Sequence, residues 1–143
     1  MQSQGRVMAL DYGSRRIGLA LSDPEGRFAF PDPALERHGL RQDLKALCAL
    51  VDERRVTRIV VGLPIHLDGR SGIEAQAARA FAESLAEATG LPVDMLDERW
   101  TTREAERALR GAKGGLRRTG RGAIDSAAAA ILLRTYLERE RER

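Results

Sequence analysis

The feature that most constrains this chain is an apolar strand set between two amphipathic helices. Residues 58–64 (RIVVGLP) are almost entirely apolar, which is typical of a strand buried on both faces of a parallel sheet. Apolar residues recur at helical spacing from Leu40 onward and again through 73–89, where Gly90 can end the second helix. The alternation of helix and strand implies parallel strand pairing with right-handed crossovers.

The segments before this region predict an antiparallel meander. Residues 6–11 and 16–22 have the composition of strands and are joined by a tight glycine-containing turn. The turn signal DPEG follows, and residues 27–30 (RFAF) can form a third strand. We expect Pro31 and Pro33 to end regular structure after it.

The second half of the chain continues the alternation. Residues 91–98 (LPVDMLDE) predict a further strand, and a capping-box pattern predicts a helix over about 102–112. A segment rich in glycine and arginine follows at 111–122, before an alanine-rich helix from about 123 to 139. The predicted fold class is α/β, with a mixed five-stranded sheet in which strands one to three are antiparallel and strands one, four and five are parallel. Helices cover its faces.

Composition limits the class of protein. The 143 residues are 43% hydrophobic and contain no linker, so we expect one domain over residues 1–143. A single cysteine excludes an internal disulfide framework, and two histidines argue against a zinc site. The N-terminus lacks the apolar stretch of a signal peptide, and no apolar run reaches membrane-spanning length. We therefore expect a cytoplasmic protein with no membrane partner.

Three acidic residues lie where the predicted elements begin or end. Asp11 closes the first strand, Glu98 closes the last strand, and Asp125 lies in the first turn of the final helix. Sites in such sheets form at the carboxyl ends of the parallel strands, so the ends of the first and last strands are expected near one edge. Carboxylates that converge without basic partners repel one another, and divalent cations relieve that repulsion. Two such ions can also clamp a phosphodiester for hydrolysis.

Each acid also has an ordinary structural explanation. Asp125 can interact favourably with a helix dipole. Glu98 can pair with Arg99 or Arg103 at the surface. Asp11 can accept N–H groups from the glycine turn that follows it. The residues by themselves leave the metal site and these alternatives open.

The distribution of basic residues is consistent with a polyanionic partner. The net charge is +3, and only two of the 24 basic residues are lysines. Arginine binds phosphate well, although arginine-rich codon usage explains the composition equally well. The window 99–121 alone carries a charge of +6, which suits nucleic acid approaching an acidic site. The alternative is a solvated helix face followed by a flexible loop.

Four blocks of this sequence resemble the signature motifs of the YqgF family, also called RuvX. The blocks are LDYGSRRIGLALSD, VVGLPIHLDGRSG, DERWTTREAE and IDSAAAAILLRTYL, and together they span about residues 7–137. The resemblance implies a ribonuclease H-like fold related to Holliday junction resolvases of the RuvC type. It also implies a nuclease that uses two Mg²⁺ or Mn²⁺ ions, with Asp11, Glu98 and Asp125 as catalytic metal ligands.

Two positions depart from the family pattern. His66 stands where asparagine is common in the loop after the apolar strand, and Trp100 stands where smaller apolar residues are common. His66 is therefore only a candidate substrate contact, because a single loop histidine is more often neither a ligand nor an acid.

The resemblance favours cleavage of structured RNA, with precursor 16S ribosomal RNA and its 5′ end as the expected target and ribosomal precursor particles as possible partners. Besides His66, the candidate substrate-binding residues are Arg15, Arg16, Arg99, Thr101, Thr102, Lys113, Arg117, Arg118 and Arg121. RNA is favoured over DNA only by the family association. Monomer and homodimer stay undetermined.

Three other functions stay open on the sequence. The same chemistry on a branched DNA junction requires two sites related by a dyad, hence a dimer. A nucleotide-binding domain is suggested by DYGSRRIG, which resembles the first phosphate motif of actin–hexokinase ATPases, but those proteins need a second lobe. A nucleic-acid-binding adaptor without catalysis would depend on the arginines and not on the acids.

Overall fold

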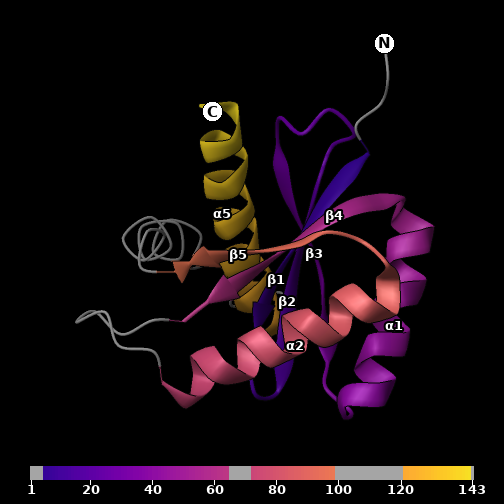
Figure 1. Cartoon of the computed structure of the whole chain (residues 1–143). Coiled ribbons are helices and arrows are strands. Elements are labelled where there is room, and N and C mark those ends of the chain that lie inside the picture. The colour runs from indigo at the N-terminus through magenta and orange to yellow at the C-terminus, as the bar shows by residue number, and fades with distance from the viewer. Residues whose placement is uncertain (1–4, 65–71, 99–120, 143) are drawn as a thin grey trace.

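A five-stranded sheet of order β3-β2-β1-β4-β5 forms the centre of the protein (Figure 1). The computed structural model describes residues 5–64, 72–98 and 121–142. The strands are β1 (Arg6–Tyr12), β2 (Arg16–Ser22), β3 (Ala29–Glu36), β4 (Val56–Leu63) and β5 (Val93–Asp97). The helices are α1 (Leu40–Arg54), α2 (Ile73–Thr89) and α5 (Arg121–Arg141).

The strand pairing confirms the mixed sheet predicted from the sequence. β1 pairs with β2, and β2 with β3, in antiparallel register. β1 pairs with β4, and β4 with β5, in parallel register. The carboxyl ends of β1, β4 and β5 therefore lie at one edge of the sheet, where sites form in folds of this kind.

The third strand differs from the prediction. β3 continues through Pro31 and Pro33 to Glu36 and does not end at residue 30. Both prolines are exposed, and β3 has only β2 as a neighbour in the sheet. Proline is tolerated in an edge strand because the missing N–H can face solvent instead of a partner strand. The expectation that these prolines end regular structure is therefore wrong.

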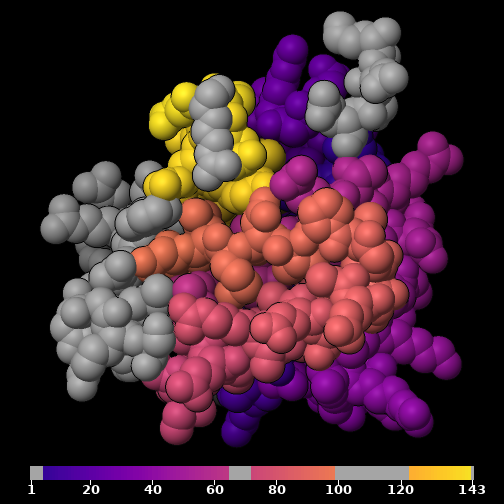
Figure 2. All heavy atoms as spheres, in the orientation of Figure 1, coloured from indigo at the N-terminus to yellow at the C-terminus, as the bar shows by residue number. Residues whose placement is uncertain are grey.

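Helices pack on both faces of the sheet. On one face α5 contacts Ala9, Ala20 and Val60 through a buried cluster that includes Leu133. On the other face α1 and α2 pack on the larger apolar side chains of β1, β2 and β4. Figure 1 shows α5 and the α1–α2 pair on opposite sides, and in Figure 2 α2 and β5 form most of the face toward the viewer.

Most element boundaries agree with the sequence prediction. α1 begins at Leu40, and Gly90 ends α2 in the left-handed region with φ 72°. α5 begins at Arg121, so Asp125 lies in its second turn and not in the first. The predicted helix over 102–112 lies outside the described residues. No described helix combines the length and apolarity that crossing a membrane requires.

Candidate active site

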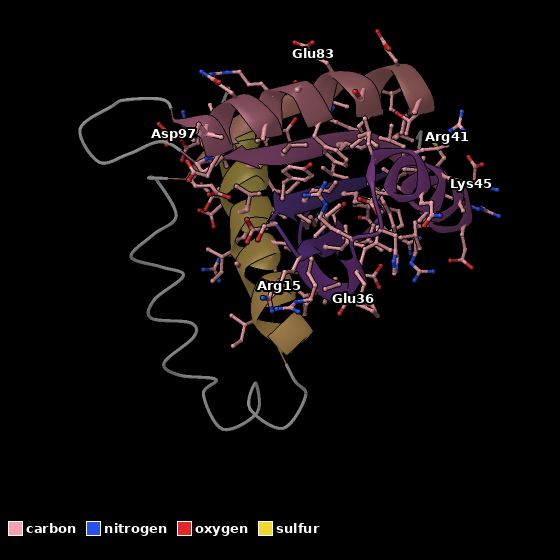
Figure 3. All side chains as sticks on the ribbon, turned by 90° about the horizontal axis from the view of Figure 1, so that it is seen from below. Arg15, Glu36, Arg41, Lys45, Glu83 and Asp97 are labelled. Atoms are coloured by element: carbon pink, nitrogen blue, oxygen red, sulfur yellow. The ribbon has the colours of Figure 1, made fainter. Side chains whose placement is uncertain are left out.

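The two-residue alternation of the strands directs acidic side chains toward α5. In β1, Ala9 packs against α5, and Asp11 two residues later continues on that face. In β5, Leu96 packs in the same cluster, and Glu98 follows two residues later. In each strand an apolar residue on the α5 face is thus followed, two positions later, by an acid at the carboxyl edge. Figure 3 shows the end of β5 at Asp97.

Two strand glycines lie against the acids Asp125 and Glu98. Gly18 of β2 lies directly opposite Asp11, and an added methyl group there would collide with the main chain of Asp125 and approach its Cβ to 3.1 Å. Gly62 of β4 lies under Glu98, and an added methyl group would approach Cγ and Cδ of that residue to 3.0 Å. The missing side chains therefore leave the space that Asp125 and Glu98 occupy.

Asp11 and Glu98 form a hydrogen bond across the end of the sheet. Burial, the charge of Asp11 and a hydrogen bond with Asp11 raise the pKa of Glu98 to about 8. Burial also raises the pKa of Asp11, the charge of Asp125 adds to that rise, and the hydrogen bond from Glu98 opposes it. The protonated Glu98 therefore donates to the Asp11 carboxylate near neutral pH.

Asp125 lies beside this pair but binds an arginine. Nε of Arg16 donates to Oδ2 of Asp125 at 2.8 Å, and the two side chains are 23% and 33% exposed. This hydrogen bond raises the pKa of Arg16. Asp125 is close enough to Asp11 for its charge to raise the pKa of that carboxyl. The third acid thus has a basic partner, which the sequence interpretation of three unpartnered carboxylates did not include.

The acids fit a divalent cation in part. The Asp11–Glu98 pair offers partly buried carboxyl oxygens, the ligands that Mg²⁺ and Mn²⁺ prefer, and a cation would offset the repulsion that arises once both groups are ionised. Among residues 5–64, 72–98 and 121–142, no group of three or more acidic, histidine or cysteine side chains is placed to hold a metal jointly. Asp11 and Glu98 are therefore the pair that could hold an ion, and Asp125 is an adjacent acid that Arg16 engages.

The predicted substrate contacts are described only in part. Arg15 is exposed in the turn between β1 and β2, and Figure 3 shows it beside Glu36. Arg41 and Lys45 of α1 lie well away from this turn in the same view. Arg121 begins α5. The other candidates lie outside the described residues: His66, Arg99, Thr101, Thr102, Lys113, Arg117 and Arg118.

Sequence reasoning missed the two glycines as part of the site. The available signal was a glycine inside each of two apolar strands, because such a glycine often marks the close approach of another part of the chain. Nothing in the local sequence says what approaches. In the folded protein Gly18 meets the second turn of α5 and Gly62 meets Glu98.

Comparisons of sequence identify the relatives of this chain. The RuvX family, described as Holliday junction resolvase, matches residues 5–139. A Koribacter versatilis relative is 43% identical over 135 residues, covering 94% of this chain and 88% of the relative. A relative from Anaeromyxobacter sp. strain Fw109-5 is 45% identical over 133 residues, covering 93% and 96%. Both are provisionally named pre-16S rRNA nucleases.

Comparisons of structure identify the fold. Thermus thermophilus RuvC in complex with a Holliday junction substrate matches with a TM-score of 0.62 and 15% identity, covering 94% of this chain and 95% of that chain. A second structure of T. thermophilus RuvC matches with a TM-score of 0.54. These matches confirm the predicted ribonuclease H-like fold. Because the family match spans nearly the whole chain and relatives exceed 40% identity, this protein belongs to the RuvX family.

Proposed function

We propose that this protein is a metal-dependent nuclease that hydrolyses phosphodiester bonds in structured RNA, with the 5′ end of precursor 16S ribosomal RNA as its target. The observation that carries the proposal is the partly buried Asp11–Glu98 pair at the carboxyl edge of the sheet, where Gly62 leaves room for Glu98. The provisional name of the relatives as pre-16S rRNA nucleases supports RNA as the substrate class.

Asp11 and Glu98 would hold the divalent ion, Mg²⁺ or Mn²⁺, with Asp125 as the third acid of the site. Ions bound there would activate a water molecule and stabilise the leaving oxygen of the phosphodiester. Because the pKa of Glu98 is about 8, the pair retains a proton near neutral pH that ion binding must displace. Near neutral pH the pair would therefore become fully anionic only with a cation present.

Two arginines next to the acids suit a phosphate-containing substrate. Arg15 is exposed in the turn that follows Asp11, and Arg16 bridges Asp125 and Glu36, at 2.8 Å and 3.9 Å. Guanidinium groups bind phosphate oxygens in a bidentate manner. Positive charge on this turn would offset the repulsion between a nucleic-acid backbone and the carboxylates. We propose Arg15 as a phosphate contact and Arg16 as a group shared between Asp125 and substrate.

A cleavage panel tests the proposal. End-labelled precursor 16S rRNA, an unstructured RNA and a four-way DNA junction would be incubated with the protein in Mg²⁺ or Mn²⁺. We expect the precursor to be cut, and Asp11→Asn and Glu98→Gln to lose at least about a hundredfold of the rate, because each removes a metal-binding oxygen. The matched control is Asp52→Asn, since Asp52 is an exposed acid of α1. Cleavage retained by Asp11→Asn would contradict the assignment.

Resolution of DNA junctions is the second candidate. The family description and the fold match to T. thermophilus RuvC with a Holliday junction substrate favour it. Paired incisions across a junction need two active sites related by a dyad, so this function requires a dimer. Two measurements test this candidate: cutting of the four-way junction, and the oligomeric state by light scattering. Symmetric cutting by a dimer would show that branched DNA, and not RNA, is the substrate.

A further inference from the structure

The ion pair between Arg37 and Asp43 lies next to the turn between β1 and β2, and its acid is buried. Asp43 of α1 is 1% exposed, and its carboxylate accepts the backbone N–H of His38 at 2.9 Å and Nε of Arg37 at 3.3 Å. Arg37 directly follows β3 and is 22% exposed. A buried ion pair generally adds little stability over an apolar replacement, because removing both charges from water is costly. The stability of the pair therefore rests mainly on Asp43, whose carboxylate lies in the first turn of α1 and accepts a backbone N–H.

Arg37 connects this ion pair to the turn between β1 and β2. One terminal guanidinium nitrogen donates to the carbonyl of Gly13 at 3.1 Å. The backbone N–H of Arg37 donates to the carbonyl of Arg15 at 2.9 Å. The turn itself contributes a bond from the N–H of Gly13 to the carbonyl of Arg16, at 3.0 Å. Arg37 thus donates two hydrogen bonds to this turn, in addition to the Gly13–Arg16 bond within the turn itself.

Arg37 also restrains the residue next to Asp11. Its Cζ lies 4.5 Å from the centroid of the Tyr12 ring, and the same ring stacks on Phe81 of α2 with centroids 4.3 Å apart. Successive residues of a strand point to opposite faces of the sheet. Tyr12 held on the α2 side therefore orients Asp11 toward α5, where Glu98 lies.

We propose that Arg37 and Asp43 are positioning residues of the nuclease site. Asp43 holds Arg37, and Arg37 holds both Tyr12 and the turn over residues 13–15. This arrangement sets the direction of the Asp11 carboxylate and the place of Arg15 without either residue of the pair touching substrate. The role of Asp11 in cleavage rests on the function proposed above. The geometry of the turn does not.

The chain offers a matched control for this pair. Arg54 Nε binds Asp32 Oδ2 at 3.3 Å, the same atom types and distance as in the Arg37–Asp43 pair, and their side chains are 32% and 15% exposed. It also connects β3 with α1, but no hydrogen bond from it to the turn over 13–15 is found among the described residues. Arg54→Gln and Asp32→Asn therefore remove an ion pair of the same atom types and distance that makes no described hydrogen bond to this turn, and Arg54→Gln also removes the Arg54–Glu53 pair.

The experiment compares Arg37→Gln and Asp43→Asn with these two controls. In Arg37→Gln and Asp43→Asn we expect kcat on precursor rRNA to fall about ten- to hundredfold, because a small displacement of a reacting group lowers the rate by roughly that factor. We also expect amide exchange at residues 13–15 to become at least about tenfold faster and the Kd for Mn²⁺ to rise. The controls should keep kcat, exchange and Kd within about twofold. Arg37→Lys should be intermediate, since one ammonium cannot reach all partners of the guanidinium.

The outcomes separate this inference from the proposed function. Equal loss in Arg54→Gln, or normal exchange at residues 13–15 in Arg37→Gln, would overturn the positioning role. If Arg37→Gln fails to fold, Arg37→Lys and Asp43→Asn decide by the same measurements. If the wild-type protein cleaves none of the three substrates, the proposed function fails. Amide exchange and Mn²⁺ affinity then still decide whether Arg37 sets the turn and the acid pair.

Discussion

The carboxyl group of Glu98 makes the stability of the protein depend on pH. Its pKa is about 8 in the folded protein and near 4.5 in its ordinary state, so the folded state holds the proton more tightly. The resulting stabilisation is fully present below about pH 4.5 and is lost as pH rises through 8. One pKa unit corresponds to about 1.4 kcal/mol, so the loss is on the order of a few kcal/mol.

We therefore predict that the metal-free protein melts at a lower temperature at pH 8.5 than at pH 6. Mg²⁺ or Mn²⁺ should reverse much of this loss, since cation binding favours the deprotonated pair. The measurement is thermal unfolding in chelator and in metal at both pH values. Glu98→Gln should remove most of the difference between the two pH values. A slope that persists unchanged in Glu98→Gln would show that another group causes it.

We predict that Gly62→Ala lowers metal affinity and the cleavage rate while it changes the free energy of unfolding only slightly. The added methyl group would collide with Oε1 at the end of the Glu98 side chain, and this end must move away, which a side chain can do more easily than a backbone. We expect the free energy of unfolding to change by less than about 1 kcal/mol, since nothing rigid is displaced. Mn²⁺ affinity, measured by calorimetry, and the cleavage rate should each fall about tenfold. Unchanged Mn²⁺ affinity would separate Glu98 from the metal site.

At the scale of elements, the position of α5 depends on Gly18. An added methyl group at Gly18 meets the backbone carbonyl of Asp125, and a helix backbone cannot yield as a side chain does. Gly18→Ala should therefore lower the free energy of unfolding by about 1–3 kcal/mol, the usual cost of overpacking. Denaturant titration of this variant beside Gly62→Ala tests the contrast. Equal stability of the two variants would mean that α5 does not rest on β2 as described.

Strand β3 shows why an element can extend beyond its sequence signal. Two prolines in three residues predict a break when each strand is assumed to have two neighbours. β3 lies at the edge of the sheet and pairs only with β2, with Pro31 opposite Ala20. The position of a strand in the sheet order, and not its own composition, decides whether a missing N–H is harmful.

At the scale of the whole molecule, charge should govern affinity for nucleic acid. The window 99–121 carries +6 against +3 for the entire chain, although nearly all of it lies outside the described residues. We predict that RNA affinity falls steeply as salt rises, because binding releases counterions. The double variant Arg117→Ala, Arg118→Ala should reduce the slope of log K against log salt by roughly 1.4. The slope would be measured by fluorescence anisotropy. An unchanged slope would show that Arg117 and Arg118 do not contact the RNA backbone.

The sequence by itself determined the order of strands and helices and most of their boundaries. Apolar residues repeat with a period of two or of 3.6, and this period is a local property of the chain. The almost entirely apolar strand now seen as β4 and the helices on either side of it therefore predicted the parallel half of the sheet. The same local information placed Asp11 and Glu98 at strand ends.

Only the tertiary structure decided what these acids contact. Arg16 and Asp125 are 109 positions apart, yet they form an ion pair, and Asp11 forms a hydrogen bond with Glu98 from the opposite half of the chain. Gly18 and Gly62 are ordinary strand glycines until α5 and Glu98 lie against them. Charge pairing and close approach depend on distances between remote segments. Such distances exist only once the sheet and its helices have packed.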